Sequence, residues 1–373
     1  MVNYQLKIGT QGPIFPPFEN VVKTVKKLDE LYDSIWWPDH LMGWIPDILW
    51  KPEKIEIAKF QNSPHIFLET FTLMASVACH TSKASLGSLV TESFRRHPAM
   101  IAQTFLTLDH ISKGRAILGI GAGEAENIVP YGLEWKSPAK RLEECIEIIR
   151  LLWSGKKINY NGKIWKLKDA VLSLPPEKEG KYPEIWVGAH SKKTLEITGR
   201  LGDGWIPEHL EIDDYITKLD NIRNAARKSG REPDDITPAM FASMILCEEH
   251  EECHKLFNST AAKAYALLTP AQTYEKYGYK HPLGLLNAYK EYIPTTADET
   301  EILKAINEIP EEICEHRYLH GNVDEVIKQI EEYALKGLQH IVLWNLTPMC
   351  DYKKTKESFS SLLKVVEYFK NVR

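Results

Sequence analysis

The first chemistry-bearing stretch of the sequence is residues 34–44, SIWWPDHLMGW. An apolar run at residues 35–37 is followed at once by Pro38, Asp39 and His40, and Trp44 comes four residues after the histidine. A histidine can take or give a proton near neutral pH. The pattern therefore predicts a site at the end of a buried strand, in which His40 exchanges a proton beside the indole of Trp44. A histidine that only caps the next segment is the structural alternative.

The second such stretch is residues 119–127, GIGAGEAEN. Its three glycines, Gly121 among them, permit a ligand to approach the backbone because no Cβ blocks the way. Glu124 and Asn127 follow, three residues apart, so that one helical turn would point both the same way. We interpret this stretch as a binding segment at the end of another strand, with a tight turn and a solvated acid as the alternative.

Two further segments have weaker signals for binding. In VGAHSKKT, residues 187–194, small residues precede Ser191, and free N–H groups at a helix start can bind a phosphate. In GSLVTESFRRHP, residues 87–98, Ser88 and Leu89 end an apolar run, and the basic pair Arg95 and Arg96 precedes a helical stretch. Arginines at a helix start are unfavourable for the helix dipole, so we expect them to contact an anion or solvent.

The elements that must position these residues alternate between short apolar segments and longer amphipathic ones. This alternation predicts a parallel sheet, and eight repeats predict a closed (β/α)₈ barrel. The alternative is an open doubly wound sheet. The GxGxxG motif that such sheets often carry at the start of the first helix is missing here. The predicted strands are residues 6–11, 34–40, 84–90, 115–123, 183–190, 202–207, 238–247 and 339–345, and the predicted helices are 18–32, 97–112, 138–153, 191–201 and 322–337.

Two interruptions of this alternation are predicted to be insertions into a single domain that spans residues 1–373. Residues 41–65 follow the second strand, and the helical, charged residues 248–320 follow the seventh. Long excursions after barrel strands gather at the site end. His281 in the second insertion is a further candidate for that site, although a histidine before a proline is often a turn residue.

Composition limits the partners and the cellular location. The net charge of −5 comes without a Lys/Arg block, and no apolar run reaches 18 residues, so we expect a cytoplasmic protein that binds a small molecule and neither nucleic acid nor membrane. The six cysteines include no CxxC pair, so we expect reduced thiols. Cys247, His250, Cys253 and His254 match no common zinc spacing, and we therefore expect no metal site.

Taken together, these stretches resemble the bacterial luciferase-like superfamily, and within it the oxidoreductases that use the 8-hydroxy-5-deazaflavin coenzyme F420. The group most similar is that of the phthiodiolone ketoreductases. The similarity lies in the segments RAILGIGAGEAENIVPYGLEWKSPAKRLEE (115–144), LPPEKEGKYPEIWVGAH (174–190), GRLGDGWIP (199–207), HPLG (281–284) and GLQHIVLWN (337–345). The family's fold is a (β/α)₈ barrel with insertions, its members are commonly homodimers, and its reaction is hydride transfer between the deazaflavin and a carbonyl, alcohol or imine-like carbon.

The resemblance also implies roles for individual residues. His40 corresponds to the family's acid/base, Trp44 lies beside the reacting centre, and Glu124 lies near the ring of the cofactor. The matching cofactor-binding positions are Asp39, Ser88, Leu89, Gly121, Glu124, Asn127, Gly188, Ala189, His190 and Ser191. Relatives also have a non-proline cis peptide behind the ring, for which Ser88–Leu89 is the matching position.

The resemblance leaves two alternatives within the family and one outside catalysis. An FMN-dependent luciferase-like monooxygenase would need oxygen and a flavin reductase. A methylene-tetrahydromethanopterin reductase shares barrel and coenzyme, but its GPGD version of the fourth-strand motif is not present here. A barrel that has lost catalysis and serves in binding or assembly is the third. A sugar phosphate is disfavoured as substrate, because residues 206–214, IPEHLEIDD, are acidic where a phosphate needs cations.

Overall fold

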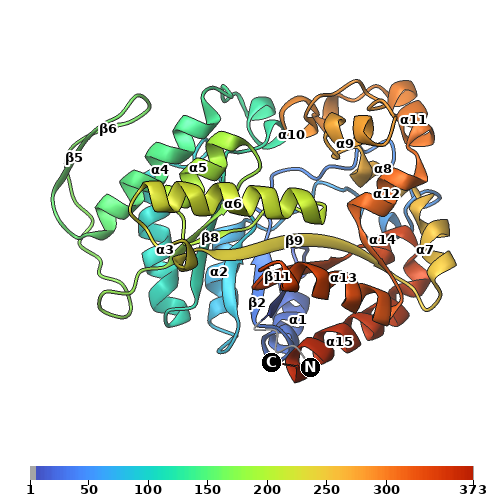
Figure 1. Ribbon diagram of the computed structural model, residues 1–373, viewed down its shortest axis with the longest axis horizontal. Coiled ribbons are helices and arrows are strands. Elements are labelled where there is room, and N and C mark those ends of the chain that lie inside the picture. The colour runs from blue at the N-terminus through green and yellow to red at the C-terminus, as the bar shows by residue number, and fades with distance from the viewer. Residues whose placement is uncertain (1–5, 373) are drawn as a thin grey trace.

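Eight parallel strands form a closed barrel in the computed structural model, which describes residues 6–372 (Figure 1). The chain of pairings runs from β1 through β2, β3, β4, β7, β8, β9 and β11 and returns to β1. The barrel strands are β1 (Lys7–Gln11), β2 (Ser34–Trp37), β3 (Ser85–Ser88), β4 (Ala116–Gly121), β7 (Glu184–Gly188), β8 (Gly204–Trp205), β9 (Thr237–Leu246) and β11 (His340–Asn345). Each overlaps a segment predicted as a strand, and only β9 begins one residue before its predicted segment, so the predicted (β/α)₈ barrel is confirmed.

Amphipathic helices cover the outside of the barrel, and their apolar residues join the main core around Ile35, Leu118 and Ile341. These helices are α1 (Phe18–Leu31), α2 (Thr70–Ala78), α3 (Pro98–Ser112), α4 (Pro138–Trp153), α5 (Lys192–Leu201), α6 (Ile212–Lys228), α13 (Val323–Leu335) and α15 (Thr355–Asn371). Three of them, α2, α6 and α15, were not among the predicted helices. The six cysteines are free thiols, as predicted.

The inside of the barrel is a packed layer of side chains. Trp36 of β2 and Trp186 of β7 lie with their ring centroids 5.1 Å apart, and Val342 of β11 packs with them. Below them, the Trp36 indole donates to Ser34 Oγ at 2.7 Å, and that hydroxyl also lies 2.7 Å from His340 Nε2. Because this interior is filled, a ligand must bind at an open end of the barrel.

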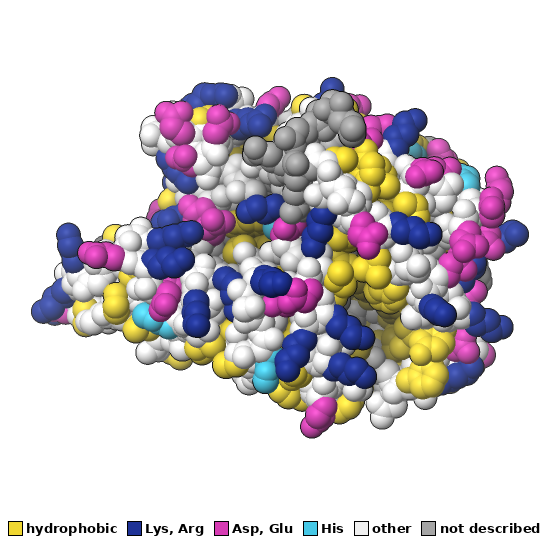
Figure 2. Space-filling view, turned by 90° about the horizontal axis from the view of Figure 1, so that it is seen from below, with side chains coloured by type: hydrophobic (Ala, Val, Ile, Leu, Met, Phe, Trp, Pro, Cys, Tyr) yellow, Lys and Arg dark blue, Asp and Glu magenta, His cyan; other side chains and the backbone are white. Residues whose placement is uncertain are grey.

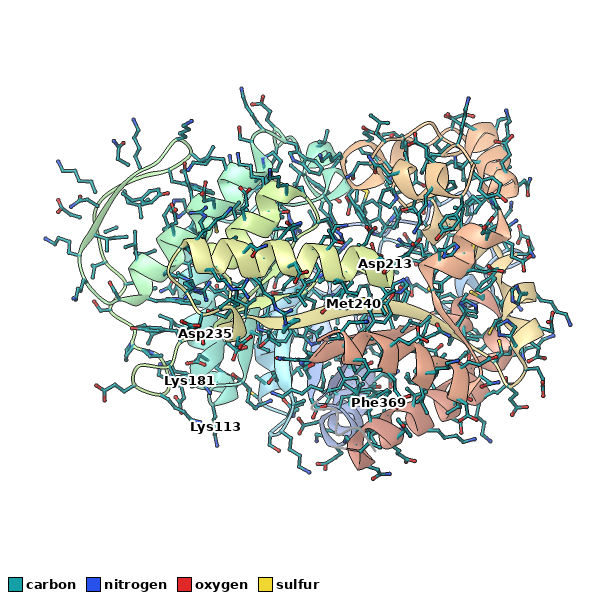
Figure 3. All side chains as sticks on the ribbon, viewed as in Figure 1. Lys113, Lys181, Asp213, Asp235, Met240 and Phe369 are labelled. Atoms are coloured by element: carbon teal, nitrogen blue, oxygen red, sulfur yellow. The ribbon has the colours of Figure 1, made fainter. Side chains whose placement is uncertain are left out.

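The two ends of the barrel can be told apart in Figure 3. Lys113, Lys181 and Asp235, which precede β4, β7 and β9, lie on one side of the molecule and mark the N-terminal end. Asp213 follows β8 and lies away from them. Residues that directly follow the strands, including His40, therefore lie at the opposite, C-terminal end.

Two features are added to the barrel. A hairpin of β5 (Ile158–Asn161) and β6 (Lys166–Ala170), which was not predicted, projects from the body (Figure 1). The segment between β9 and α13 consists of α7 (His250–Phe257), α8 (Thr260–Ala266), α9 (Ala271–Lys276), α10 (Ala288–Glu291), α11 (Glu299–Glu308), α12 (Glu311–Arg317) and the short strand β10 (Leu319–Gly321). We call residues 248–320 the insertion; β10 extends the far end of β9, outside the closed ring.

The insertion has a core of its own. Phe257, Tyr274, Ile302 and Tyr318 are buried there, and the second apolar cluster also includes Trp44 from the loop after β2. The two predicted insertions are thus packed against one another. That residues 1–373 fold as a single domain stays a prediction.

The surface seen in Figure 2 carries basic and acidic side chains side by side, in keeping with the small net charge. Within residues 6–372, the structure contains no helix with the length and apolar character that a membrane crossing requires.

Candidate active site

His40 and Glu124 come together at the C-terminal ends of β2 and β4. The chain leaves β2 through Pro38 and Asp39, and it leaves β4 through a glycine turn into the short helix η2 (Ala125–Asn127). As a result His40 Nε2 lies 3.4 Å from Glu124 Oε2, and the imidazole is 11% exposed while the carboxylate is 32% exposed. Residues from two distant motifs therefore share one site, as the sequence analysis expected.

The imidazole of His40 is held from both sides of the ring. Its Nδ1 lies 3.1 Å from the Met42 carbonyl oxygen, 3.3 Å from Asn127 Nδ2 and 3.5 Å from Glu126 Oε1, while Nε2 faces Glu124. The ring also stacks on Phe67, with centroids 5.6 Å apart. These contacts hold Nε2 beside the Glu124 carboxylate at the mouth of the barrel, where it can exchange a proton.

Asn127 joins η2 to the loop after β2. Its Oδ1 accepts from the Leu41 backbone N–H at 2.7 Å, which fixes the amide orientation, and its Nδ2 donates to Glu126 Oε1 at 2.5 Å. The Asn127 side chain is buried, and it contacts Leu41, Glu126 and His40. These contacts show a positioning role for Asn127, and its predicted contact with a cofactor stays a prediction.

Glu126 is a member of the site that sequence reasoning missed. It is fully buried, and its Oε2 has no hydrogen-bond partner. Burial raises the pKa of Glu126 well above the ordinary value for a glutamate, and the nearby charge of Glu124 raises it further. A second negative charge beside Glu124 is therefore disfavoured at Glu126. The sequence signal was slight: a second acid within a run of small residues.

Asp39 is held by a clamp of charged groups from the segment after β3. Arg96 donates to both of its carboxylate oxygens, Thr91 Oγ1 donates to Oδ2 at 2.6 Å, and Arg95 Nη2 lies 3.1 Å from the same oxygen. Arg95 also donates to the Asp39 carbonyl at 2.6 Å. The anion that the two arginines were expected to contact is thus Asp39 itself. This arrangement fixes the backbone next to His40, and the predicted cofactor contact of Asp39 stays a prediction.

Trp44 lies between His40 and the insertion. Its ring centroid is 6.0 Å from that of His40, 5.4 Å from that of Tyr289 and 6.4 Å from that of Tyr292. The Tyr292 hydroxyl is buried without a hydrogen-bond partner. These rings form an aromatic wall on one side of the imidazole, as expected for Trp44, and the two tyrosines that complete it were not predicted.

A second polar group reaches the mouth from β8 and the insertion. Glu208, just after β8, accepts hydrogen bonds from Arg317 of α12 and from the hydroxyl of Tyr289. Burial raises the pKa of Glu208 and the charge of Glu124 adds to the effect, while the Arg317 guanidinium opposes it. Because Glu208 follows the end of β8, it lies on the same side of the barrel as His40. Sequence reasoning noted Glu208 only as part of an acidic stretch and missed Arg317.

The floor of the site is formed where β3, β4 and β7 end. Ser88 Oγ is buried and donates to the Gly119 carbonyl at 2.8 Å, so Ser88 joins β3 to β4. A non-proline cis peptide is present, but it joins Leu89 to Val90, one residue after the predicted Ser88–Leu89 position. The prediction was wrong by one residue because Ser88 is still the last residue of β3 and pairs with Trp37, so the chain can turn only after it.

Two glycines lie side by side above this floor. Gly121 of β4 pairs with Gly188 of β7, and an added Cβ would lie 2.9 Å from Val90 Cγ2 at Gly121 and 3.1 Å from the same atom at Gly188. The space that a side chain would need at either position is thus taken by Val90, so the two glycines let the segment after β3 pack closely on the strand ends. The predicted contact of Gly121 and Gly188 with a cofactor stays a prediction.

The remaining predicted positions lie where β7 passes into α5. The Ala189 carbonyl accepts from the Trp205 indole at 2.9 Å, and Ser191 caps α5 in a capping box with Thr194. His190 is exposed, and its Nε2 accepts from the Glu208 backbone N–H at 3.4 Å. The structure thus places His190 beside Glu208, while Ser191 opens a ten-residue helix, where a phosphate is favourable.

His281 is not presented at the mouth. It is buried within the insertion, where its Nε2 lies 2.9 Å from the Leu267 carbonyl and its Nδ1 accepts from the Leu283 backbone N–H at 3.2 Å. Both ring nitrogens are therefore used in holding the insertion together.

Comparisons with known proteins agree with this arrangement. The family model described as luciferase-like monooxygenase matches residues 3–340. The chain is 37% identical over 319 residues, 84% of each protein, to a phthiodiolone/phenolphthiodiolone dimycocerosates ketoreductase of Mycobacterium tuberculosis (strain ATCC 25618 / H37Rv). It is 29% identical over 272 residues to a 5,10-methylenetetrahydromethanopterin reductase of Archaeoglobus fulgidus, covering 73% of this chain and 80% of the relative.

Solved structures share the fold. An F420-dependent secondary alcohol dehydrogenase in complex with an F420-acetone adduct matches with a TM-score of 0.72 at 20% identity, covering 96% of this chain and 99% of the other. A coenzyme F420-dependent tetrahydromethanopterin reductase from Methanopyrus kandleri matches with the same score and identity over 98% and 99%. The chain belongs to the luciferase-like monooxygenase family, and like these relatives it is an oxidoreductase.

Proposed function

We propose that this oxidoreductase uses coenzyme F420 to interconvert a carbonyl, or an imine-like carbon, and its reduced form in a small organic substrate. The observation that carries the proposal is the orientation of His40. Its Nδ1 is held by the Met42 carbonyl while Nε2 faces the mouth 3.4 Å from Glu124. The names of the two relatives and of the two solved structures, all reductases or dehydrogenases, support this reaction class.

The cofactor supplies a hydride from a ring carbon that stands where a flavin has a nitrogen. Residues of this chain that would hold it are Gly121 and Gly188, by close backbone approach, and Ser191 at the start of α5. The fit rests on three observations: the paired glycines, the buried and unpartnered Glu126 Oε2, and the wall formed by Trp44. The cofactor-binding roles of Leu89, Ala189 and His190 belong to the same proposal.

His40 moves the proton of the reaction. In oxidation Nε2 takes the proton of the substrate hydroxyl; in reduction the imidazolium returns it to the oxygen. The carboxylate of Glu124 stabilises the imidazolium, because opposite charges at this distance in a water-poor site attract strongly. The raised pKa of Glu126 disfavours a second charge next to Glu124, while Phe67 and Trp44 restrict the ring and exclude water.

A binding experiment tests the cofactor assignment. Purified apo-protein is titrated separately with F420 and with FMN while tryptophan fluorescence is recorded, because Trp36, Trp44 and Trp186 lie near the site. We expect F420 to quench the tryptophan fluorescence at a low concentration, and FMN at the same concentration to leave it unchanged. Tight FMN binding without F420 binding would instead favour an oxygen-dependent monooxygenase, and binding of neither would contradict both.

A second experiment tests the reaction. Reduced F420 is mixed with the protein and a panel of ketones and aldehydes, with a methylene-tetrahydropterin as a separate arm, and cofactor oxidation is followed by absorbance. We expect turnover with at least one carbonyl compound, and we expect this turnover to require His40. Turnover with the pterin alone would place the chain among reductases of that substrate.

A further inference from the structure

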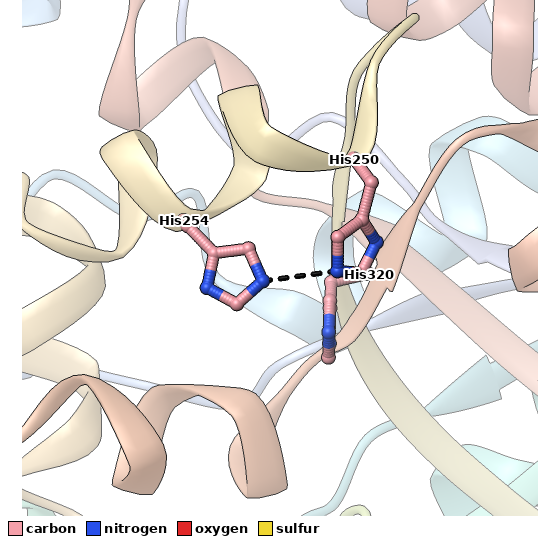
Figure 4. Close-up of side chains that lie close together, drawn as sticks. All are labelled: His250, His254 and His320. Atoms are coloured by element: carbon pink, nitrogen blue, oxygen red, sulfur yellow. Dashed lines mark hydrogen bonds between the residues drawn. The ribbon is translucent and has the colours of Figure 1, made fainter.

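Three histidines gather outside the mouth, where the insertion begins and ends (Figure 4). His250 and His254 lie one turn apart on α7, and His320 lies on β10. One ring nitrogen from each lies within 4.8 Å of the other two, and all three residues are partly exposed. Two separate elements therefore direct three imidazoles at one point that a solvated ion can reach.

The other side of each imidazole faces an oxygen acceptor. Because an acceptor at Nδ1 requires a hydrogen there, each ring is held in the tautomer whose Nε2 has a free lone pair. The three contacts are His254 Nδ1 to Glu311 Oε1 at 2.6 Å, His250 Nδ1 to Glu325 Oε2 at 3.3 Å and His320 Nδ1 to the Tyr318 carbonyl at 3.0 Å. Metal-binding histidines are usually oriented by partners of these two kinds.

Two of the Nε2 atoms lie so close together that their lone pairs repel each other when both rings are neutral. His250 Nε2 and His254 Nε2 are 3.0 Å apart, so while both rings are neutral and keep their Nδ1 hydrogen bonds, two lone pairs face each other unless a proton or a metal ion lies between them. A cation between the lone pairs removes this conflict. Two nitrogens bound tetrahedrally to Zn²⁺, each at about 2.0–2.1 Å, are separated by roughly 3.3 Å, close to the spacing found here.

The surroundings also favour neutral, metal-binding imidazoles and an ion of positive charge. His320 is held within the cluster by the Tyr318 carbonyl, 3.0 Å from its Nδ1. Glu315 Oε1 lies 3.4 Å from His254 Nδ1, which adds a second carboxylate beside Glu311. Phe257 packs against both His254 and His320 and closes one side of the cluster.

We propose that His250, His254 and His320 bind one divalent transition-metal ion of the zinc type, with the fourth position taken by water. The nearby Cys253 is not a ligand, because its thiol is buried and donates to the Ile245 carbonyl at 3.3 Å. The expectation of no metal rested on the local spacing around His250 and His254. The third ligand lies far along the chain, where spacing cannot reveal it.

The metal connects the two ends of the insertion. It joins α7, the first helix, to β10, the last element, and β10 follows Arg317, which bonds Glu208 at the mouth. An ion that closes so long a segment restricts the unfolded chain and adds its binding free energy to folding. The role is thus structural, and it is independent of which cofactor the barrel binds.

Metal titration of the full chain tests the proposal. Metal-free protein is titrated with Zn²⁺ by calorimetry and with Co²⁺ by visible absorption, and thermal unfolding is followed in parallel. We expect one Zn²⁺ per chain, a Co²⁺ spectrum typical of four-coordinate nitrogen and oxygen ligands, and a higher melting temperature with metal.

Matched variants assign the ligands. His254→Gln and His320→Gln are expected to weaken Zn²⁺ binding by about 100-fold or more, and Glu311→Gln, which keeps all three ligands, by about 10-fold. His80→Gln, at an exposed position after α2, is the control and should bind as the original protein does. Absence of a stoichiometric site in the folded protein, or binding undiminished in both His254→Gln and Glu311→Gln, would overturn the proposal.

Discussion

At the scale of single residues, the chemistry depends on the His40 nitrogen that faces the mouth. The Met42 carbonyl and Asn127 contact Nδ1, and Nε2 lies beside Glu124. Replacing the ring by His40→Gln removes the proton acceptor but keeps a side chain of similar length. We predict that turnover falls by about 100-fold or more while F420 affinity changes little, measured by steady-state kinetics and fluorescence titration.

The matched control is His110→Gln, which alters a histidine on the outer helix α3 whose Nδ1 lies 2.8 Å from Glu177. It should leave turnover unchanged. Unaltered turnover in His40→Gln would remove His40 from the reaction, whereas a parallel loss of F420 affinity would make it a binding residue.

Glu126 gives a prediction for pH dependence. Its folded pKa is raised by burial and by Glu124, so the folded chain keeps this proton to a higher pH than the unfolded chain does. The contribution of Glu126 to the free energy of unfolding is therefore most favourable below about pH 4.3, the pKa of a glutamate in the unfolded chain. It is lost as the pH rises through the higher pKa of Glu126 in the folded chain. Glu126→Gln cannot ionise and still accepts from Asn127. We predict that its free energy of unfolding falls less between pH 5 and pH 8 than that of the original protein.

Urea unfolding of both proteins at the two pH values measures this difference. Each unit by which the pKa of Glu126 in the folded chain exceeds that in the unfolded chain corresponds to about 1.4 kcal/mol in the free energy of unfolding. Identical pH dependence in the two proteins would show that Glu126 ionises as freely in the folded chain as in water.

At the scale of elements, the loop after β2 is held by the segment after β3. Asp39 is 4% exposed, and its carboxylate is shared by Arg96, Arg95 and Thr91. Removing one partner of a buried ion pair leaves the other charge uncompensated. We predict that Asp39→Ala lowers the free energy of unfolding by about 3 kcal/mol and also lowers turnover, because His40 is the next residue.

Chemical unfolding and kinetics measure the two effects, with Glu56→Ala as the control. Glu56 pairs with Lys59 at 2.7 Å on the surface and should matter little. Equal stability of Asp39→Ala and Glu56→Ala would mean that the clamp does not hold the loop.

The ends of β4 and β7 give a prediction for binding. A Cβ at Gly188 would lie 3.1 Å from Val90 Cγ2, and larger side chains would extend over the bare backbone. We predict that Gly188→Val weakens F420 binding by about 10-fold or more, measured by fluorescence titration, because the ring can no longer approach the strand. Unchanged affinity with retained fold would place the cofactor elsewhere.

How well the elements could be predicted follows from their local patterns. Buried parallel strands are short, β-branched runs, so all eight barrel strands were found, even the two residues of β8. The hairpin β5–β6 was missed because its strands are short and largely exposed, so the alternation of Ile158 and Tyr160 with two asparagines is too brief to distinguish it from a loop. The cis peptide was placed one residue early, since register within β3 depends on its pairing with β2.

At the scale of the whole molecule, the insertion closes over one side of the mouth. Arg317 of α12 and Tyr289 both donate to Glu208 after β8, which ties the insertion to the barrel. Arg317→Met leaves Glu208 without its cation. We predict faster cleavage of residues 248–320 in limited proteolysis and a KM raised by about 10-fold, with kcat less affected.

Tyr265→Phe is the comparison variant, since it changes a partly buried tyrosine of the same insertion and keeps the Arg317 contact. Proteolysis of Arg317→Met at the original rate would show that the insertion is held by its apolar core alone.

The arrangement of the whole molecule also explains which residues of the site could be predicted from the sequence. His40, Trp44 and Glu124 follow strands, where parallel topology brings side chains together, so a reading of the sequence could find them. Glu126, Glu208 and Arg317 depend on how η2 turns and how the insertion folds back, which no local spacing encodes. The expected homodimer and cytoplasmic location stay predictions.

The central claim is that the C-terminal mouth binds a deazaflavin with His40 beside its reactive face. A crystal structure of the protein with F420 tests it most directly. We predict that the deazaflavin ring lies between Gly188 and Trp44. His40 Nε2 should then lie within about 3 Å of the position taken by a substrate oxygen, or be linked to it through one water molecule. A ring bound at the N-terminal end of the barrel, or one whose open face points away from His40, would contradict it.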